Sequence, residues 1–369
     1  MVNVTMFQAG KGDFFDLAYG EENDWHHILI DGGEKQASNQ YRKTLQYIKN
    51  RNQSIDAIIF THIDNDHITG ALHAFVNMNK EELPDIHAVY FNTGNAICRI
   101  QELTKPEKPE DFPFVTKSTG QHSVKKAQSL LKVLDDKGLK KVLKDYIVQG
   151  EHINLLGGAE LDMISPNTKE LENFILKWDK EIEPADKKGK LHKGNSVSTR
   201  IYEENIEDYI KSSHPEDDSV TNRSSLAFIF RYKSVKIAFL GDACPSVCVE
   251  GIKKFSPEGI QVDLLTLAHH GSSANISDDL LEMIRTEKYL LSTTGEKLSK
   301  YLWARLVKGE KKAYVYCNYD WWKSIYCQKY FSQKDFETYI ETERLTTHLV
   351  EHKGEKIRDG LWLYRSIQV

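Results

Sequence analysis

The chain has 369 residues, a net charge of −5 and a sequence pI near 6.3. Its hydrophobic fraction of 40% and charged fraction of 28% are ordinary for a globular protein, which excludes wholesale disorder. The acidic balance excludes a global attraction for nucleic acid or anionic lipid, although it is compatible with a local basic groove.

The opening residues, MVNVTMFQAGKGDFF, lack a basic stretch followed by an apolar run. No segment of the sequence approaches the roughly 18 consecutive apolar residues of a transmembrane helix. We therefore expect no signal peptide, no membrane association and a cytoplasmic location. The five cysteines are scattered, and only Cys244 and Cys248 are closely spaced, which favours core thiols in a reducing compartment over a structural zinc site.

Strands and helices are expected to alternate along the chain. The first predicted elements are strands at 2–8 and 26–30, which form an opening hairpin, a helix at 40–51 and a buried strand at 54–60. This strand ends at the polar cluster THIDNDH, and a helix follows it. Later strands are expected at 86–92, twice within 153–166, and at 224–232, 235–242, 262–268, 288–294 and 313–318, followed by a closing hairpin with its turn near Gly354.

Two segments interrupt this pattern. We expect a domain over 1–320 with insertions at about 93–150 and 167–220, and a C-terminal extension, 321–369, packed on the same domain. The first insertion contains a proline-containing loop at 103–114 and one or two helices within 122–148, whose Lys-rich face is either solvated or in contact with a polyanion. The second is polar, helical at 169–178 and otherwise mobile.

Three predicted strands end in residues that suit metal binding. One runs into the cluster His62-Ile63-Asp64-Asn65-Asp66-His67, a second ends at Asp242, and a third ends at His269 and His270. Loops after separate strands can converge at one edge of a sheet, and a divalent cation would relieve the repulsion between Asp64 and Asp66. The plainer interpretation of the cluster is an exposed acidic loop whose aspartates cap the next helix.

The motifs resemble those of the metallo-β-lactamase-fold hydrolases. THIDNDH is similar to their H-x-[HD]-x-D-H signature, the segment LGD at 240–242 to their bridging aspartate, and AHHGSS at 268–273 to their final histidine motif. The motif sequences are most similar to those in the hydrolase domain of the competence proteins that import DNA. AGKGD at 9–13, IDGG at 30–33 and NRSSL at 222–226 follow the order of motifs in that branch.

The resemblance implies an α/β fold of the αββα sandwich type, in which two mixed β-sheets pack face to face with helices outside. It also implies one or two divalent metal ions. His62 and Asp64 would hold one ion, Asp66 and His67 a second, and Asp242 would bridge both. Of the last pair we prefer His269 as the ligand, with His270 either supporting the ligands or facing the substrate.

Two departures from the family pattern concern the site. The family often has a further ligand histidine where this chain has NRSSL, and His152 and His214 are the nearest substitutes in sequence. A Gly-His-Pro element that commonly follows STTG in this branch is replaced by EKLSKYLW. Because the ligand set is rich in oxygen, Mn²⁺ is an alternative to the default Zn²⁺.

Roles follow for several other residues. Asp66 would orient or deprotonate the attacking water, and His270 would protonate the leaving group or stabilise the developing charge. Asp13 and Asp31 are interpreted as supporting residues. Asn222, Ser224 and Ser225 form either a substrate contact or a strand-entry turn. Trp321 and Trp322 lie in the core or stack a base.

Three functions are compatible with these features. The first is a metal-dependent phosphodiesterase or nuclease acting on nucleic acid or a nucleotide. The second is hydrolysis of a lactam, lactone or thioester. The third is a non-catalytic, metal-stabilised subunit of a defence or mobile-element system, and no protein partner is identified.

Overall fold

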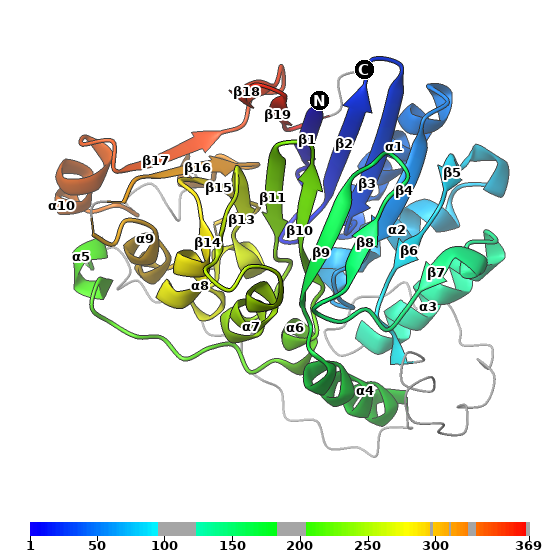
Figure 1. Cartoon of the computed structure of the whole chain (residues 1–369), viewed down its shortest axis with the longest axis horizontal. Helices are drawn as coiled ribbons and strands as arrows, with labels where there is room; N and C mark the ends of the chain where they lie inside the picture. Colours follow the sequence, from blue (N-terminus) through cyan, green and yellow to red (C-terminus); the bar gives the residue numbers. More distant parts are fainter. Residues whose placement is uncertain (95–122, 183–203, 296–297, 310, 324–329, 367–369) are drawn as a thin grey trace.

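Two large β-sheets pack face to face, and helices cover both outer faces (Figure 1). The computed structural model describes residues 1–94, 123–182, 204–295, 298–309, 311–323 and 330–366. This architecture confirms the predicted αββα sandwich. No helix within those ranges is long and apolar enough to cross a membrane.

The first sheet has the order β18-β19-β1-β2-β3-β4-β6-β7, with β5 beside β4. It is mixed, because β1 pairs antiparallel with β2 but parallel with β19. Its strands are β1 (Val2–Met6), β2 (Phe15–Glu21), β3 (Asp24–Ile30), β4 (Ser54–Ile59), β5 (Asp85–Ile86), β6 (Val89–Tyr90), β7 (Leu143–Lys144), β18 (Glu355–Arg358) and β19 (Leu361–Tyr364).

The second sheet has the order β17-β16-β15-β13-β11-β10-β9-β8, and β12 and β14 form a separate pair. Strands β11, β13, β15, β16 and β17 are parallel neighbours, so their carboxyl ends share one edge. The strands are β8 (His152–Asn154), β9 (Glu160–Ser165), β10 (Ala227–Tyr232), β11 (Val235–Phe239), β12 (Ile260–Gln261), β13 (Leu264–Thr266), β14 (Ile284–Arg285), β15 (Lys288–Leu291), β16 (Ala313–Cys317) and β17 (Leu345–Leu349).

Three hydrophobic clusters correspond to the interfaces between the four layers. Alternate residues of β10 divide between them, since Phe228 and Phe230 face the other sheet while Ile229 faces the helices of its own side. The helices are α1 (Ser38–Asn50), α2 (Asn65–Val76), α3 (Ser123–Asp136), α4 (Thr168–Ile182), α5 (Ile206–Tyr209), α6 (Val220–Arg223), α7 (Pro245–Phe255), α8 (Asp278–Met283), α9 (Lys300–Leu306) and α10 (Gln333–Asp335).

The predicted opening hairpin is wrong, because β2 lies between its two strands. β1 pairs with β2 and β2 pairs with β3, so the chain opens as a three-stranded meander. Asp16 and Gly20 weaken the strand signal of this segment, since both residue types are depleted in strands. Asp16 is nevertheless buried, because its carboxylate pairs with Nδ1 of His27 at 2.8 Å.

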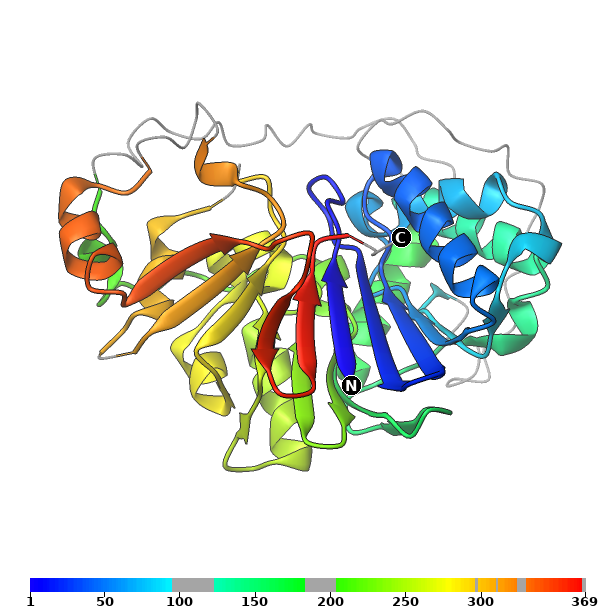
Figure 2. The ribbon, with the colours of Figure 1, turned by 90° about the horizontal axis from the view of Figure 1, so that it is seen from above.

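The predicted closing hairpin is displaced along the chain. β17 joins β16 in the second sheet, whereas β18 and β19 form a hairpin that turns at Gly360 and pairs with β1 in the first sheet. Figure 2 shows the red β18 and β19 beside the blue β1. The last strands of the described chain therefore belong to two different sheets.

The predicted insertions are partly described by the structure. α3 and α4 confirm helices within 122–148 and at 169–178. The loop at 103–114 and most of the charged run at 179–194 lie outside the described residues. Residues 204–220, which we expected to be mobile, instead form α5 and a loop that packs beside Ala274 through the bond from Asp217 N to Ala274 O.

Candidate metal centre

The residues predicted to bind metal lie on loops that leave β4, β11 and β13. The loop after β4 carries His62 to His67, and α2 begins within it at Asn65. The N–H of His269 donates to the carbonyl of Gly241 at 2.9 Å, which joins the other two loops to each other. Asp64 occupies the N-cap of α2 but makes no capping hydrogen bond through its side chain, so the capping interpretation does not account for this residue.

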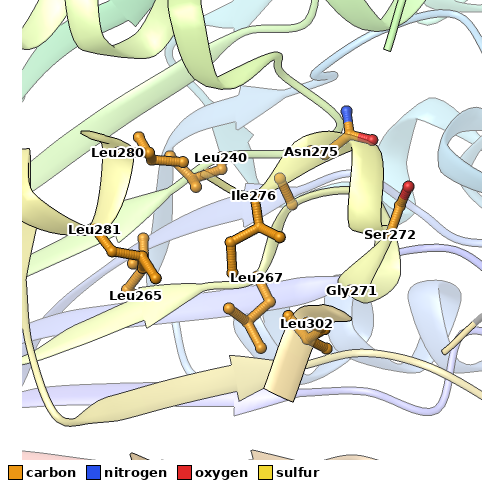
Figure 3. A pocket seen from close by; sticks show the side chains of 11 residues that line it. Leu240, Leu265, Leu267, Gly271, Ser272, Asn275, Ile276, Leu280, Leu281 and Leu302 are labelled. Atoms are coloured by element: carbon orange, nitrogen blue, oxygen red, sulfur yellow. The ribbon is translucent and has the colours of Figure 1, made fainter. Parts of the chain in front are cut away.

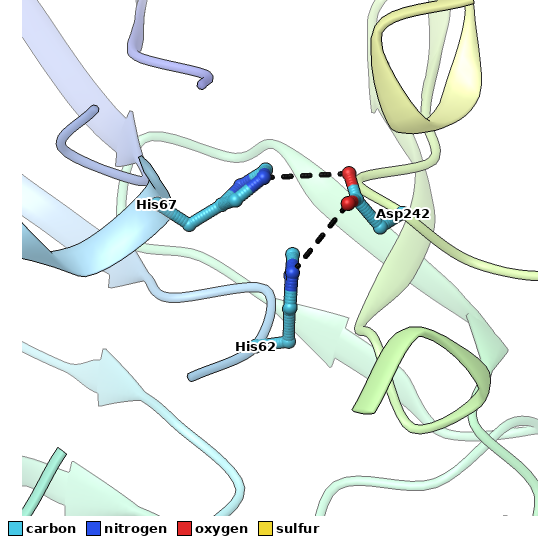
Figure 4. Close-up of side chains that lie close together, drawn as sticks. All are labelled: His62, His67 and Asp242. Carbon is cyan, nitrogen blue, oxygen red and sulfur yellow. Dashed lines mark ion pairs between the residues drawn. The ribbon is translucent and has the colours of Figure 1, made fainter. Parts of the chain in front are cut away.

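Asp242 lies at the centre of the site, with different histidines facing its two carboxylate oxygens. His62 Nε2 is 3.6 Å from Oδ2, and His67 Nε2 is 3.4 Å from Oδ1 (Figure 4). His269 Nε2 is also 3.6 Å from Oδ2, and His270 Nε2 is 3.9 Å from Oδ1. Oδ2 thus faces His62 and His269, and Oδ1 faces His67 and His270, although donor atoms of His62, His67 and Asp242 also lie within 4.8 Å of one another.

Two other aspartates add one carboxylate to each side. Asp64 Oδ2 lies 3.9 Å from His62 Nε2, and Asp66 Oδ2 lies 3.8 Å from His270 Nε2. Their side chains are 36% and 29% exposed, whereas that of Asp242 is 4% exposed. The more exposed carboxylates therefore mark the side from which a substrate can approach.

The distances between these donor atoms fit binding to a common metal ion better than direct hydrogen bonding. Two ligand atoms about 2.1 Å from one ion, at a tetrahedral angle, are roughly 3.4 Å apart. The distances from Asp242 to its histidines are 3.4 to 3.9 Å, longer than an ordinary hydrogen bond. The buried atoms His62 Nε2, His67 Nε2, His270 Nε2 and Asp242 Oδ1 make no hydrogen bond, so these residues fit a divalent ion.

The four imidazoles have their other ring nitrogen, Nδ1, held by polar neighbours. The partner of His62 is the hydroxyl of Thr61 at 3.0 Å, and the partner of His67 is Asp31 at 2.8 Å. The Nδ1 of His269 lies 3.0 Å from Asn275 Oδ1 and 3.3 Å from Asp217 Oδ2, and that of His270 lies 3.2 Å from Ser292 O and 3.4 Å from Asp13 Oδ1. Such partners orient ligand histidines and fix their tautomers.

The two adjacent histidines reach opposite sides of Asp242 because their backbone is left-handed. The φ angles are 49° at His269, 56° at His270 and 82° at Gly271. Left-handed conformations are uncommon outside glycine and cluster at functional sites. The side chain of His270 is 4% exposed, and His270 forms one potential metal group with Asp66 and His67, so its position also suits a ligand.

A small apolar cavity lies behind this loop (Figure 3). Its volume is about 10 Å³, and most of its lining is aliphatic, with Ser272 and Asn275 at one edge. Such a volume holds at most one water molecule, so this cavity is too small for a substrate.

The electrostatics of the site favour a bound cation. Burial opposes the ionisation of Asp242, but His269, His67 and His62 hold the pKa of its carboxyl well below the ordinary value. Burial also opposes the charging of His67, yet the carboxylates of Asp242 and Asp31 raise its pKa well above the ordinary value. Burial, together with His67, lowers the pKa of His62. A cation would therefore compete with the proton of His67 for an ionised carboxylate.

His152 and His214, the possible replacements for the missing ligand histidine, have other partners. His152 pairs with Asp162 on β9 at 2.7 Å, and His214 contacts Ser273 Oγ at 3.1 Å. Among the described residues, the compact groups of donor atoms that could hold an ion include neither of them, nor His269. The Nε2 atom of His269 nevertheless lies 3.6 Å from Asp242 Oδ2, the oxygen that His62 also faces.

Other predicted residues fall into supporting or core positions. Asp13 and Asp31 approach the rings of His270 and His67, in agreement with supporting roles. Ser225 Oγ accepts a hydrogen bond from Asp242 N at 3.2 Å. Trp321 is 2% exposed and stacks on Trp303, which confirms the core interpretation for this residue.

Cys244, Cys248 and Cys317 are buried free thiols, as expected of core cysteines. Cys98 and Cys327 lie outside the described residues. Sequence reasoning missed Asp217 and Asn275, which both face Nδ1 of His269. Asp217 belongs to a polar stretch with no periodic pattern, and no spacing in the sequence connects it to His269.

Comparison with known proteins supports the resemblance at the level of the superfamily. Residues 22–75 match the family model described as the metallo-beta-lactamase superfamily, and this segment includes His62 to His67. The match does not extend to the later motifs and does not single out the competence proteins. No curated protein matches the chain by sequence.

Solved structures with similar folds share little sequence with the chain. The metallo-beta-lactamase fold protein YhfI from Bacillus subtilis has 12% identity and a TM-score of 0.38, over 85% of this chain and 95% of that chain. Zinc-bound PqqB from Methylobacterium extorquens has 10% identity and a TM-score of 0.35, over 90% and 84%. Unliganded yeast PDE1 has 10% identity and a TM-score of 0.43, over 95% and 98%. At identities and TM-scores this low, none of the three indicates what this chain does.

Proposed function

We propose that this chain is a metal-dependent hydrolase with two divalent ions, and that its substrates are phosphodiesters. The observation that carries the proposal is the division of the donor atoms by Asp242. Its Oδ2 faces His62 and His269, and its Oδ1 faces His67 and His270. With Asp64 and Asp66, each side offers two imidazoles, one carboxylate and one oxygen of the shared Asp242 carboxylate.

The chemistry of such a centre suits a phosphodiester. A pair of divalent ions activates water at neutral pH and neutralises charge on the attacking and leaving oxygens of a phosphoryl group. The chain contributes the positions of the donors, and the partly exposed carboxylates of Asp64 and Asp66 are accessible to solvent. The order of the motifs supports nucleic acid or a nucleotide as the substrate class.

The roles of Asp66 and His270 differ in this proposal. Asp66 is partly exposed, so its carboxylate can bind an ion through one oxygen and orient the attacking water through the other. His270 is almost fully buried and its Nδ1 faces Asp13 and Ser292, so it acts as a ligand rather than as the proton donor to the leaving group.

The donor set is compatible with both of the expected metals. Four imidazole nitrogens suit Zn²⁺, and the three carboxylates make Mn²⁺ an acceptable alternative. We propose Zn²⁺ as the first metal to test.

The function is tested by loading the protein with Zn²⁺ or Mn²⁺ and measuring hydrolysis of bis(p-nitrophenyl) phosphate. We expect metal-stimulated turnover in the wild type and a loss on the order of 100-fold in Asp242→Asn, because outer and inner ligands typically change activity by such factors. Asp136→Asn, at an exposed position of α3, is the matched control and should retain activity.

Two results would contradict the substrate assignment. Turnover of a lactone, thioester or β-lactam without phosphodiester turnover would move the proposal to another bond. Stoichiometric metal binding without hydrolysis of any of these substrates would favour a non-catalytic protein.

A further inference from the structure

A second inference concerns Asp217 and the segment of chain that carries it. Asp217 Oδ2 lies 3.3 Å from Nδ1 of His269, and Asn275 Oδ1 lies 3.0 Å from the same nitrogen. We propose that Asp217 is a positioning residue that aims His269 at the ion on the His62 side of Asp242. The inference rests on the metal centre of the proposed function and assigns a role to residues 204–220, which the family resemblance does not explain.

The contacts of His269 settle which ring nitrogen carries its proton. The amide nitrogen of Asn275 donates to the carbonyl of Asp242 at 3.0 Å, so the amide oxygen of Asn275 faces His269. Two acceptors then lie close to Nδ1, namely this oxygen and the Asp217 carboxylate. The amide nitrogen of Asn222 also lies 3.4 Å from Nδ1, but it donates to Asp217 Oδ2 at the shorter distance of 2.7 Å. The two acceptors therefore favour a proton on Nδ1, which leaves Nε2 with a lone pair 3.6 Å from Asp242 Oδ2.

Asp217 is itself held in place by hydrogen bonds of its side chain and backbone. The N–H of Ser219 donates to its Oδ1 at 2.8 Å, and the amide of Asn222 donates to its Oδ2 at 2.7 Å. The N–H of Asp217 donates to Ala274 O at 3.1 Å, beside Asn275. Because both acceptors of His269 are fixed on this side, the imidazole has one favoured orientation.

The segment around Asp217 is linked to α7 and α6, and through Arg223 to α4. Glu216 accepts hydrogen bonds from the N–H and hydroxyl of Ser246, at the start of α7, at 2.5 and 2.6 Å. Arg223 of α6 pairs with Glu216 at 3.1 Å and with Glu170 of α4 at 2.8 Å. Figure 1 shows this segment in green between α5 and α6. The ion pairs make it a fixed part of the rim of the site.

This arrangement accounts for the absence of a histidine in NRSSL. His270 occupies the Asp66 side, and the left-handed backbone turns His269 to the His62 side. A chain with a histidine at NRSSL would not need His269 as a ligand. Here the second imidazole on the His62 side comes from His269, and its orientation comes from Asp217.

The test measures the affinities of the two ions separately, by chelator competition and by the visible absorption spectrum of bound Co²⁺. We expect Asp217→Ala to weaken one of the two ions roughly 10–100-fold and to leave the other unchanged, because removing the partner of a ligand histidine has effects of that size. Asp217→Asn keeps an acceptor oxygen and should lose less. Asp218→Asn, at the exposed neighbouring position, makes the same change of charge and should bind as the wild type.

A double variant separates positioning from a general loss of structure. If Asp217 acts through His269, then Asp217→Ala in a His269→Ala background should cause no further loss of affinity. Equal loss of both ions in Asp217→Asn, or wild-type affinity for both ions in Asp217→Ala, would overturn the inference. A wild-type protein that binds no Co²⁺ or Zn²⁺ would overturn the proposed function as well, so the two failures are distinguishable.

Discussion

Asp31 accepts a hydrogen bond from Nδ1 of His67 at 2.8 Å, and neither side chain is exposed. The same carboxylate accepts bonds of 2.7 Å from the N–H and from the hydroxyl of Thr61. An ionised carboxylate only accepts hydrogen bonds, so the proton of His67 lies on Nδ1 and its Nε2 is available to an ion beside Asp242.

We therefore expect Asp31→Asn to lower metal affinity roughly 10–100-fold. The amide oxygen would keep the bond to Thr61 N–H, and the amide nitrogen would then face His67 and favour the opposite tautomer. Asparagine tolerates the left-handed φ of 55° at this position, so the backbone should be preserved. The measurement is chelator competition with the folded variant.

The control for this variant is Asp16→Asn. Asp16 forms the same kind of buried pair with His27, also at 2.8 Å, but neither residue belongs to a potential metal group. Asp16→Asn should change stability and leave metal affinity unchanged. Equal affinity in wild type and Asp31→Asn would show that Asp31 does not set the tautomer.

Metal affinity should rise with pH and then level off. Despite burial, nearby carboxylates raise the pKa of His67 and of His270 above the ordinary value. A raised pKa means that the metal-free protein holds these protons to higher pH, so protons compete with the ion at neutral and lower pH. Chelator competition between about pH 6 and about pH 8 should show this trend, with proton release on binding. Affinity independent of pH would contradict it.

Metal removal should destabilise the protein against heat. An ion present at about 100 times its dissociation constant stabilises the folded state by roughly 2.7 kcal/mol. For a chain of this size we expect a decrease in Tm on the order of 5 °C when a chelator is added. Differential scanning calorimetry with and without EDTA measures the shift, and Asp242→Ala should show no dependence on the chelator.

The buried pair of Lys300 and Asp335 should contribute strongly to stability. Asp335 also accepts hydrogen bonds from the N–H groups of Ile206 and Ser332, so the pair joins three separate segments. Lys300→Met would leave a buried carboxylate without its cation, at a cost of about 3–5 kcal/mol. Urea denaturation measures this change in the free energy of unfolding.

A surface pair provides the comparison. Lys334 pairs with Glu207 at positions that are 56% exposed, and such exposed pairs contribute little to stability. Lys334→Met should therefore change the midpoint very little. A single unfolding transition in all three proteins would also support the predicted packing of the C-terminal extension on the same domain.

The fold was largely predictable because its buried strands are short apolar runs that end in polar clusters. This pattern predicts β4, β11 and β13. In the sandwich, β11 and β13 are parallel neighbours in one sheet, and β4 belongs to the other sheet. The sequence pattern does not predict β2, because Asp16 and Gly20 interrupt the run of strand-forming residues. In the structure, the buried carboxylate of Asp16 pairs with His27 on the neighbouring strand. The sequence also does not predict that β17 joins the second sheet, since the pattern of a strand does not indicate its neighbours.

The site was predictable as a set of residues but not as an arrangement. His62, His67, Asp242 and His269 were named from loops after strands, and the structure brings them together. Which of His269 and His270 faces which side depends on two left-handed backbone conformations that the residue types do not reveal. The contact of Asp217 with His269 arises only when the polar segment before β10 folds against the site.

The pairing of β19 with β1 has a consequence for biosynthesis. β1 is synthesised first, yet it lies inside the sheet, between β2 and a strand that ends at residue 364. Until that strand emerges from the ribosome, β1 remains an open edge, and open edges recruit other strands. Nascent or truncated chains that stop before β19 should therefore depend on chaperones and be prone to aggregation.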